Sequence, residues 1–455
     1  STGTITDIDG NFQIQAPKGV LLQVSFVGYT SSEVQAVANV TVILKEDSQV
    51  IDDVVVIGYA TGSSRTVSGA VQKVGRKEMN AGIIANPLSA IKGKVAGVNI
   101  QKTGGDPTAA PAIRVRGTTS LTGGNDPLVI IDGVFGDLNM LNAISPADIE
   151  NFTVLKDASE TAQYGSRGAS GVIVVTTVKG KNGVKSMSYD GSFGIESVYK
   201  NLDMLSAAEY RSVAQERGIS ILDKGANTNF IEEMQRTGYT QNHRLSFSNG
   251  NYRASIGVID QKGILKNNSM RNYTAKLDAM QDMFKNKLKI EFGMFGSLKQ
   301  SRYINDYQKT FYSAASFNPT FPNVVNPETG MWDENANANE VQNPLGRLSI
   351  NDRENNVFIN TNARITWSII SDLKLSAFGS YTYNVKENMK YIPSTIKAGL
   401  SNRGEAYRGD NKSQSLLGNL MLTYKKAFGK HYINALGLAE VQRIINTGFG
   451  ANVHG

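Results

Sequence analysis

From Ser186 onward, apolar and polar side chains alternate along the chain in short segments of similar length. The first segment separates two faces, with Met187, Tyr189, Phe193 and Ile195 on one and Ser188, Asp190 and Ser192 on the other. The same alternation recurs around residues 245–247, 252–258, 273–277, 288–294, 357–367, 373–383 and 416–424, and residues 431–441 form one more segment with an ambiguous face. A period of two is typical of β-strands, so the pattern predicts about nine strands.

The connections between these segments are short and long in turn. Short joins at 249–251, 281–286, 370–372 and 425–430 alternate with long polar stretches at 196–242, 260–271, 298–356 and 384–412. A transmembrane β-barrel shows this alternation because one rim carries tight turns and the other carries long loops. The apolar faces also end in aromatic residues, as an interfacial girdle does: Tyr189, Tyr273, Trp367, Tyr381, Tyr383 and Tyr424. A soluble β-sandwich is the alternative.

The number of strands is too small for a closed barrel that holds an internal domain. Barrels of that kind have about 22 strands, and an open sheet would leave unpaired backbone groups in lipid. The chain also begins within a β pattern, STGTITDIDGNF, and ends just after a strand, GFGANVHG. We therefore expect a fragment cut at both ends, and the absence of a signal peptide says nothing about location.

The stretch from Ile113 to Val178 has a different pattern. Three runs rich in β-branched residues are separated by Gly-rich turns, in IRVRG, NDPLVIIDG and DIENFTVLKDASETAQYGSRGASGVIVVTTVKG. No hydrophobic helix between them is long enough to form a core. The composition predicts a small domain with a mixed sheet and many polar faces.

Composition excludes several classes of function. The chain has 455 residues and no cysteine. Its net charge of +7 is scattered rather than clustered, so we expect no nucleic-acid partner. No run of about 18 apolar residues is present, which excludes a transmembrane helix. The histidines, His243, His431 and His454, match no metal-site spacing. We therefore expect no metal, no cofactor and no enzymatic activity.

The segments upstream of this domain are also β-prone. Residues 1–45 contain an Asp9-Gly10 turn signal followed by alternating apolar residues. Residues 46–62 contain the run Val54-Val55-Val56-Ile57 between acidic residues and glycines. Such a run can add itself as a strand to the sheet edge of a partner. An edge strand of the preceding domain is the alternative.

The sequence of the 113–178 blocks resembles the plug domain of TonB-dependent outer-membrane transporters, and is most similar to the SusC/RagA-type nutrient importers of Bacteroidetes. DDVVVIGY resembles the TonB box of that family, and TDIDGNF with VSFVGY resembles the carboxypeptidase regulatory-like (transthyretin-like) domain that often precedes it. The resemblance implies a mainly β protein with four parts. These are an incomplete N-terminal β-sandwich domain (1–45), a linker with the TonB-box-like strand (46–62), an α+β plug domain (63–181) and the first part of a transmembrane antiparallel β-barrel (182–455).

The resemblance also implies the partners and the location. We expect TonB with its proton-driven inner-membrane companions, a SusD-like surface lipoprotein that acts as a lid, and outer-membrane lipid. The protein would lie in the outer membrane of a Gram-negative bacterium, with the plug and the N-terminal domain on the periplasmic side. TonB would bind Asp53, Val54, Val55, Val56, Ile57, Gly58 and Tyr59.

Two sets of plug residues are candidates for function. Arg114 and Arg116 alternate with Ile113 and Val115, so we expect both guanidinium groups on one face of a strand, paired with carboxylates of the barrel wall as a plug lock. Solvated surface arginines are the alternative. The plug loops 103–111 and 118–127 are candidate ligand-facing tips, or else ordinary connections: Thr103, Gly104, Gly105, Asp106, Thr119, Ser120, Asn125 and Asp126.

The expected function is the active import of a large nutrient, a glycan or an oligopeptide. A barrel used for adhesion or secretion, with a plug-like passenger, is the rival interpretation, and a secreted β-rich binding module is a third. The TonB-box-like strand favours import, because an exporter has no need of it. The sequence does not distinguish the two classes of ligand: aromatic residues of the 298–356 loop suit either.

Overall fold

The computed structural model describes residues 3–4, 6–7, 10–17, 19–25, 32–44, 54–57, 60–63, 71–102, 105–117, 124–180, 185–335, 340–429 and 431–455. The chain divides into two compact units, Ser1–Ser68 and Gly69–Gly455. The first unit contains two antiparallel hairpins, β1 (Leu21–Val24) with β2 (Ser32–Gln35) and β3 (Val54–Ile57) with β4 (Ala60–Ser63).

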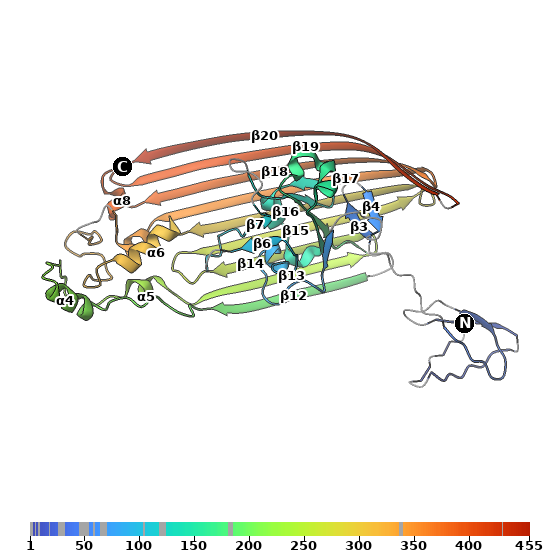
Figure 1. Ribbon diagram of the computed structural model, residues 1–455, viewed down its shortest axis with the longest axis horizontal. Helices are drawn as coiled ribbons and strands as arrows, with labels where there is room; N and C mark the ends of the chain where they lie inside the picture. Colours follow the sequence, from blue (N-terminus) through green and yellow to red (C-terminus); the bar gives the residue numbers. More distant parts are fainter. Residues whose placement is uncertain are drawn as a thin grey trace. The chain divides into compact units, whose positions relative to one another are not determined.

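The largest element of the second unit is one antiparallel sheet, which we call the wall (Figure 1). Its nine strands pair in sequence order, each with the next. They are β12 (Lys185–Glu196), β13 (Gly238–Asn249), β14 (Tyr252–Lys262), β15 (Ser269–Met283), β16 (Leu288–Tyr303), β17 (Asn351–Ile370), β18 (Leu373–Ile392), β19 (Glu405–Phe428) and β20 (His431–His454). The predicted number of strands and their antiparallel order are confirmed.

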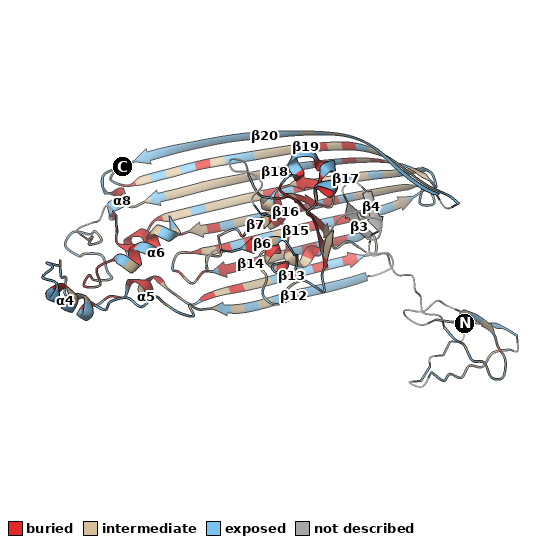
Figure 2. Cartoon of the chain, viewed as in Figure 1, coloured by how far each residue is buried: buried red, intermediate tan, exposed pale blue. Residues whose placement is uncertain are grey.

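The two faces of the wall have opposite polarity. Along β15, Asn272 and Lys276 are buried, whereas Tyr273 and Leu277 are 42% and 41% exposed. The apolar side chains therefore point outward and the polar ones point toward the interior. This is the arrangement of a barrel strand in a membrane and the reverse of a soluble domain. The wall thus has the character of part of a membrane barrel, open at β12 and β20, which Figure 2 shows largely exposed.

The strands are longer than the sequence pattern suggested. β18 and β19 continue to Ile392 and from Glu405, so most of the expected 384–412 loop is strand. In the same way, the connection between β14 and β15 shrinks to residues 263–268. The alternation of short and long connections is nevertheless confirmed.

A smaller domain, residues 71–180, lies against the inner face of the wall, and we call it the plug. Its main sheet has the order β5-β10-β11-β8-β9, and β6 pairs with β7 in a separate hairpin. These strands are β5 (Gln72–Gly75), β6 (Val98–Gln101), β7 (Ala112–Val115), β8 (Leu128–Ile131), β9 (Val134–Gly136), β10 (Ile149–Leu155) and β11 (Val172–Thr177). The helices are short: α1 (Pro87–Ala90), α2 (Leu138–Asn142), η1 (Pro146–Asp148), α3 (Ala158–Thr161) and η2 (Ala162–Gly168).

The β8–β9 hairpin shows how local sequence sets the plug geometry. Ile131 pairs directly with Val134, so Asp132 and Gly133 alone form the turn. Both have positive φ angles, 50° and 93°, as a type I′ turn requires. The turn directs Asp132 and Gly133 toward the wall: a side chain at Gly133 would lie 2.6 Å from Nη2 of Arg364 on β17.

The long connections of the wall fold into a packed layer, which we call the loop layer (residues 197–237, 263–268, 304–335, 340–350 and 393–404). It contains α4 (Ala207–Glu216), α5 (Phe230–Met234), α6 (Tyr307–Ser316), α7 (Pro344–Leu348) and α8 (Lys397–Leu400). A buried core that includes Phe230, Phe317 and Phe321 joins α5, α6 and α7, with Tyr307 and Phe311 packed against it. Several aromatic residues of the 298–356 loop therefore hold the layer together. No helix in the described ranges is long and apolar enough to span a membrane.

Candidate functional site: the contact between plug and wall

A buried carboxylate of the plug is held by basic side chains of the wall. Asp148 ends η1 and accepts a hydrogen bond from the Arg244 guanidinium of β13. Its two carboxylate oxygens accept from the Ser255 hydroxyl of β14, at 3.0 and 2.9 Å, and Arg253 lies 3.9 Å away. We call Asp148, Arg244, Arg253 and Ser255 the Asp148 cluster.

Local structure fixes the positions of these groups. Asp148 stands between the short helix that begins at Pro146 and strand β10, and its carbonyl oxygen accepts a hydrogen bond from the Val178 N–H at 2.8 Å. Arg253 and Ser255 are two residues apart on β14, so both face the plug. Arg244 is also the cross-strand partner of Asp190, whose carboxylate it contacts at 2.9 Å.

Burial makes this cluster energetically important. The side chains of Arg244 and Asp148 are 1% and 4% exposed. A buried ion pair adds little net stability, but the removal of one partner leaves an uncompensated buried charge, at a cost of about 3–5 kcal/mol. If the plug moves away, both groups become hydrated. The ion pair is therefore shielded from water while the plug lies against the wall, and water can replace it once the two separate.

Asp132 is a second plug acid beside basic wall residues. Its carboxylate accepts two hydrogen bonds from Thr177 within the plug, one from the N–H at 3.1 Å and one from the hydroxyl at 2.5 Å. Loss of water around Asp132 raises its pKa, but Lys179, Lys276 and the Thr177 hydrogen bonds outweigh this effect and the pKa lies below the usual value. Asp132 therefore stays ionised opposite Lys276 of β15.

Five further hydrogen bonds connect the plug to the wall and to the loop layer. Asn268 donates to Asp106 (2.9 Å), Asn272 to the Asn142 carbonyl (3.4 Å), and Lys386 to Asn139 (3.2 Å). Arg167 donates to Glu440 (3.0 Å) and Gln442 (2.7 Å) of β20.

The predicted pairing of Arg114 and Arg116 with the wall is wrong. Arg114 contacts Asp126 at 2.6 Å and Arg116 contacts Asp157, and both acids belong to the plug. Strand β7 ends at Val115, and Arg116 has a φ angle of 57°, so the alternation does not continue to it. Both arginines stabilise the plug itself, whereas Arg244 and Arg253 of the wall contact a plug acid.

The candidate ligand-facing residues have mixed surroundings. Gly105 and Asp106 lie against the wall connection 263–268, where Asp106 also accepts from the Thr108 hydroxyl at 2.6 Å. Asp126 pairs with Arg114, and Asn125 also makes a contact within the structure. Thr103, Gly104, Thr119 and Ser120 lie outside the described residues. A ligand role for these loops stays a prediction.

The TonB-box-like segment is partly described. Val54, Val55, Val56 and Ile57 form β3, which pairs with β4 along one edge. Asp53, Gly58 and Tyr59 lie outside the described residues. Among the described strands, β3 and β4 form a two-stranded sheet, so the second edge of β3 is unpaired there.

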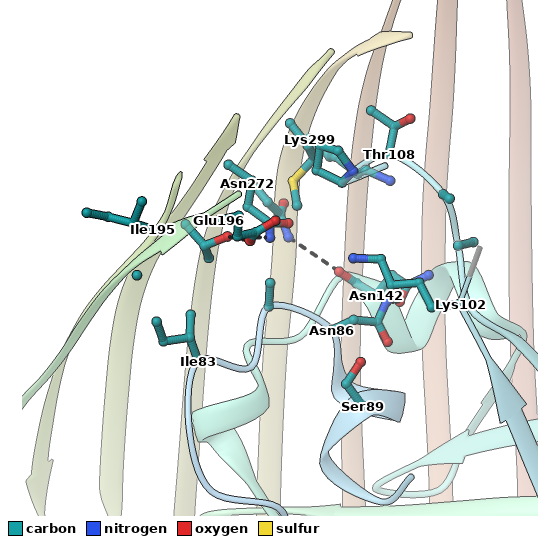
Figure 3. A pocket seen from close by; sticks show the side chains of 18 residues that line it. Ile83, Asn86, Ser89, Lys102, Thr108, Asn142, Ile195, Glu196, Asn272 and Lys299 are labelled. Atoms are coloured by element: carbon teal, nitrogen blue, oxygen red, sulfur yellow. Dashed lines mark hydrogen bonds between the residues drawn. The ribbon is translucent and has the colours of Figure 1, made fainter. Parts of the chain in front are cut away.

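A pocket of about 300 Å³ lies between plug and wall near the loop layer (Figure 3). Plug residues Asn86 and Asn142 line one side, where Asn86 donates to Asn142 at 2.7 Å. Wall residues Asn272 and Lys299 line another side. The pocket is rich in amide groups, which can both donate and accept hydrogen bonds.

The loop layer contains an acid with a shifted pKa, and this gives a testable pH dependence. Burial raises the pKa of Glu334 to about 7, although its carboxylate accepts from the Asn343 N–H at 2.6 Å. A folded-state pKa above the unfolded value means that the folded layer favours the protonated acid. The stability that protonated Glu334 gives to the folded loop layer is present below about pH 4.5 and is lost as the pH rises through about 7.

We therefore expect weaker protection of residues 330–335 and 340–345 from hydrogen exchange at pH 8 than at pH 5, measured as protection factors in the full-length protein. Glu334→Gln should remove this difference, and substitution of the exposed Glu328 by Gln should leave it. An equal pH dependence in all three proteins would contradict the assignment.

Comparison with known proteins places this arrangement in a family. The TonB-dependent Receptor Plug Domain profile matches residues 63–172. The chain is 35% identical to TonB-dependent receptor SusC of Bacteroides thetaiotaomicron, over 99% of this chain. The chain belongs to the SusC/RagA-type TonB-dependent receptors. It is also 30% identical, over 98% of its length, to TonB-dependent receptor P3 of Formosa agariphila.

Solved structures agree with this SusC/RagA-type fold. The RagAB peptide importer in its open-open state superposes with a TM-score of 0.75 at 22% identity, covering 88% of this chain and 50% of that chain. The ferric citrate transporter FecA superposes with a TM-score of 0.53 at 11% identity, covering 85% of this chain and 49% of that chain. The chain spans 48% of SusC and 46% of P3, about half of each.

Sequence reasoning missed the Asp148 cluster. Asp148 stands in SPADIE, which reads as an ordinary turn before a strand, and Arg244 is one of many basic residues in the strands. One signal was available: Arg244, Arg253 and Ser255 fall on the polar face of their strands, which must face the interior. A basic residue buried at mid-strand on that face favours an acidic partner inside the barrel.

Proposed function

We propose that this chain is the plug-bearing part of an outer-membrane importer that takes up a large nutrient, a glycan or an oligopeptide, with energy supplied through TonB. The plug closes the channel on the periplasmic side of the loop layer. A SusD-like lipoprotein covers the loops and delivers the ligand. The relatives support this proposal, because SusC and P3 are TonB-dependent receptors and RagAB is a peptide importer.

The observation that carries the proposal is the nature of the contact between plug and wall. The Asp148 cluster, the Asp106–Asn268 hydrogen bond and the Arg167 contacts are all polar. Water can replace such contacts when they separate, whereas an apolar interface would resist separation. A plug held in this way can close a channel and also move when force is applied.

The coupling to TonB is proposed to run through β3. Its unpaired edge offers backbone N–H and C=O groups to a strand of TonB, in the β-augmentation mode. Asp53, Gly58 and Tyr59 extend the same segment. Ligand binding would make the segment available in the periplasm, and TonB would pull on it.

Proline substitution tests this coupling in the full-length receptor. Val55→Pro and Val56→Pro each remove one N–H, and neighbouring N–H groups of a strand point to opposite edges. We expect at least one of them to lower TonB-dependent uptake by about tenfold, because pairing with the partner strand is interrupted. Val55→Thr and Val56→Thr keep a β-branched side chain and the N–H, and should transport normally. Unchanged uptake in both proline variants would sink the proposal.

A further inference from the structure

A row of alternating asparagine and lysine side chains crosses the wall. Asn272 of β15 pairs with Lys299 of β16, Lys299 with Asn356 of β17, Asn356 with Lys386 of β18, and Lys386 with Asn411 of β19. Residues directly opposite each other in antiparallel strands point to the same face. The five side chains therefore share one face and one level, and we call them the Asn/Lys row.

This row faces the interior, next to the plug. Asn272 donates to the Asn142 carbonyl and Lys386 to the Asn139 side chain, both in or beside α2 of the plug. Asn272 and Lys299 line the pocket of about 300 Å³. Lys299, Asn356 and Lys386 line an adjoining pocket of about 150 Å³, which shares Thr108 and Asn142 with the first. Figure 3 shows Asn272 and Lys299 side by side, with Asn142 and Lys102 across the pocket.

Several groups of the row lack partners within the described parts of the chain. Asn272 is 6% exposed, yet its side-chain oxygen accepts no hydrogen bond there. The side-chain oxygen of Asn356 is buried without a donor in the same way. Lys299 makes no hydrogen bond and no ion pair within 4 Å with any described residue. The charges of Glu354, Asp106 and Lys386 influence Lys299 electrostatically, but only from farther away. Buried polar groups are normally paired, so unpaired ones point to a ligand.

The chemistry of the row defines the ligand it would accept. The oxygens of Asn272 and Asn356 can accept from N–H or O–H donors, and the ammonium groups of Lys299 and Lys386, which line one pocket together with Glu354, can bind a carboxylate. These two lysines are two strands apart, or about 10 Å between their backbones. A ligand that satisfies the row carries acidic groups along a chain that also offers hydrogen-bond donors.

We propose that the Asn/Lys row is a binding subsite for an acidic oligopeptide. This inference rests on the proposed function, because it names the substrate class of the importer. A peptide backbone supplies N–H donors for the asparagine oxygens, and glutamate or aspartate side chains supply the carboxylates. An acidic oligosaccharide fits less well, because sugar rings present apolar faces that aromatic side chains cover, and among the described residues that line the two pockets Tyr303 is the one aromatic residue.

Calorimetric titration of the full-length receptor in detergent tests the proposal without TonB or uptake. The probes are a capped hexapeptide with two glutamates, the same peptide with two glutamines, and a galacturonate oligomer of matching charge. We expect the Lys299→Gln/Lys386→Gln receptor to bind the glutamate peptide at least tenfold more weakly than the unaltered receptor. Its affinity for the glutamine peptide should be unchanged. Lys374→Gln, at an exposed position on β18, is the control and should bind both peptides normally.

The outcomes separate this proposal from the proposed function. Equal affinity of the double variant and the unaltered receptor for the glutamate peptide overturns the subsite. Lysine-dependent binding of the galacturonate oligomer in place of the peptide overturns the peptide class. Failure of the proline variants to reduce uptake would remove the import mechanism, and it would leave these binding measurements unaffected.

Discussion

The substitution Asp148→Asn in the full-length receptor is expected to make the closed channel leak. The change keeps the shape of the side chain and removes its charge, so that Arg244, whose side chain is 1% exposed, loses its buried counter-ion and keeps only the partly exposed Asp190. Breaking a buried ion pair costs about 3–5 kcal/mol. If displacement of the plug is the one way in which Arg244 becomes hydrated, this cost raises the population of displaced plug by roughly a hundredfold or more.

The leak is measured as ion conductance of the receptor in planar bilayers without TonB. Asp126→Asn is the matched control, since Asp126 pairs with Arg114 within the plug and its side chain is 61% exposed. An exposed pair contributes about 0–1 kcal/mol, so this control should remain closed. A closed channel in both variants would show that the Asp148 cluster does not hold the plug.

A double variant distinguishes loss of the contact from general damage to the fold. Replacement of a buried ion pair by apolar residues of similar size is often neutral or stabilising. We therefore expect Asp148→Leu/Arg244→Met to leak less than Asp148→Leu alone. Equal leaks in the two proteins would mean that the substitution at Asp148 disrupts the plug in another way.

The wall could be predicted from the sequence because its physical cause is local. A strand with lipid on one side and a polar interior on the other must alternate, and residues 186–195 or 373–383 show this plainly. The alternation of apolar and polar residues fails where the strands extend beyond the hydrophobic part of the membrane. Residues 351–356 are polar on both faces, and residues 405–412 have only Ala406 and Tyr407 as apolar or aromatic side chains, so both segments read as loops although they are strand.

The contacts of the plug could not be predicted in the same way. Arg114 and Arg116 drew attention because both lie in one short motif, but a positive φ angle at Arg116 and the positions of Asp126 and Asp157 decide their partners. Asp148 meets Arg244 across a separation of 96 residues. That pairing depends on how the plug is placed within the wall, and no local pattern records it.

We propose that the plug must move relative to the wall for transport, and a reversible cross-link tests this most directly. The chain has no cysteine. A Cβ atom at Gly105 of the plug would lie 3.8 Å from Cβ of Ile264 in the wall connection 263–268, within the range of about 3.5–4.5 Å found in disulfides. Gly105→Cys/Ile264→Cys should therefore form a disulfide between the plug and the connection that joins β14 to β15 of the wall.

In the oxidised double variant we expect TonB-dependent uptake to fall to background, with ligand binding retained, because the bond holds the plug in its closed position. A reducing agent should restore uptake, and each single cysteine variant should transport equally well with and without oxidant. Uptake by the fully oxidised double variant at the rate of its reduced form would contradict a plug that moves.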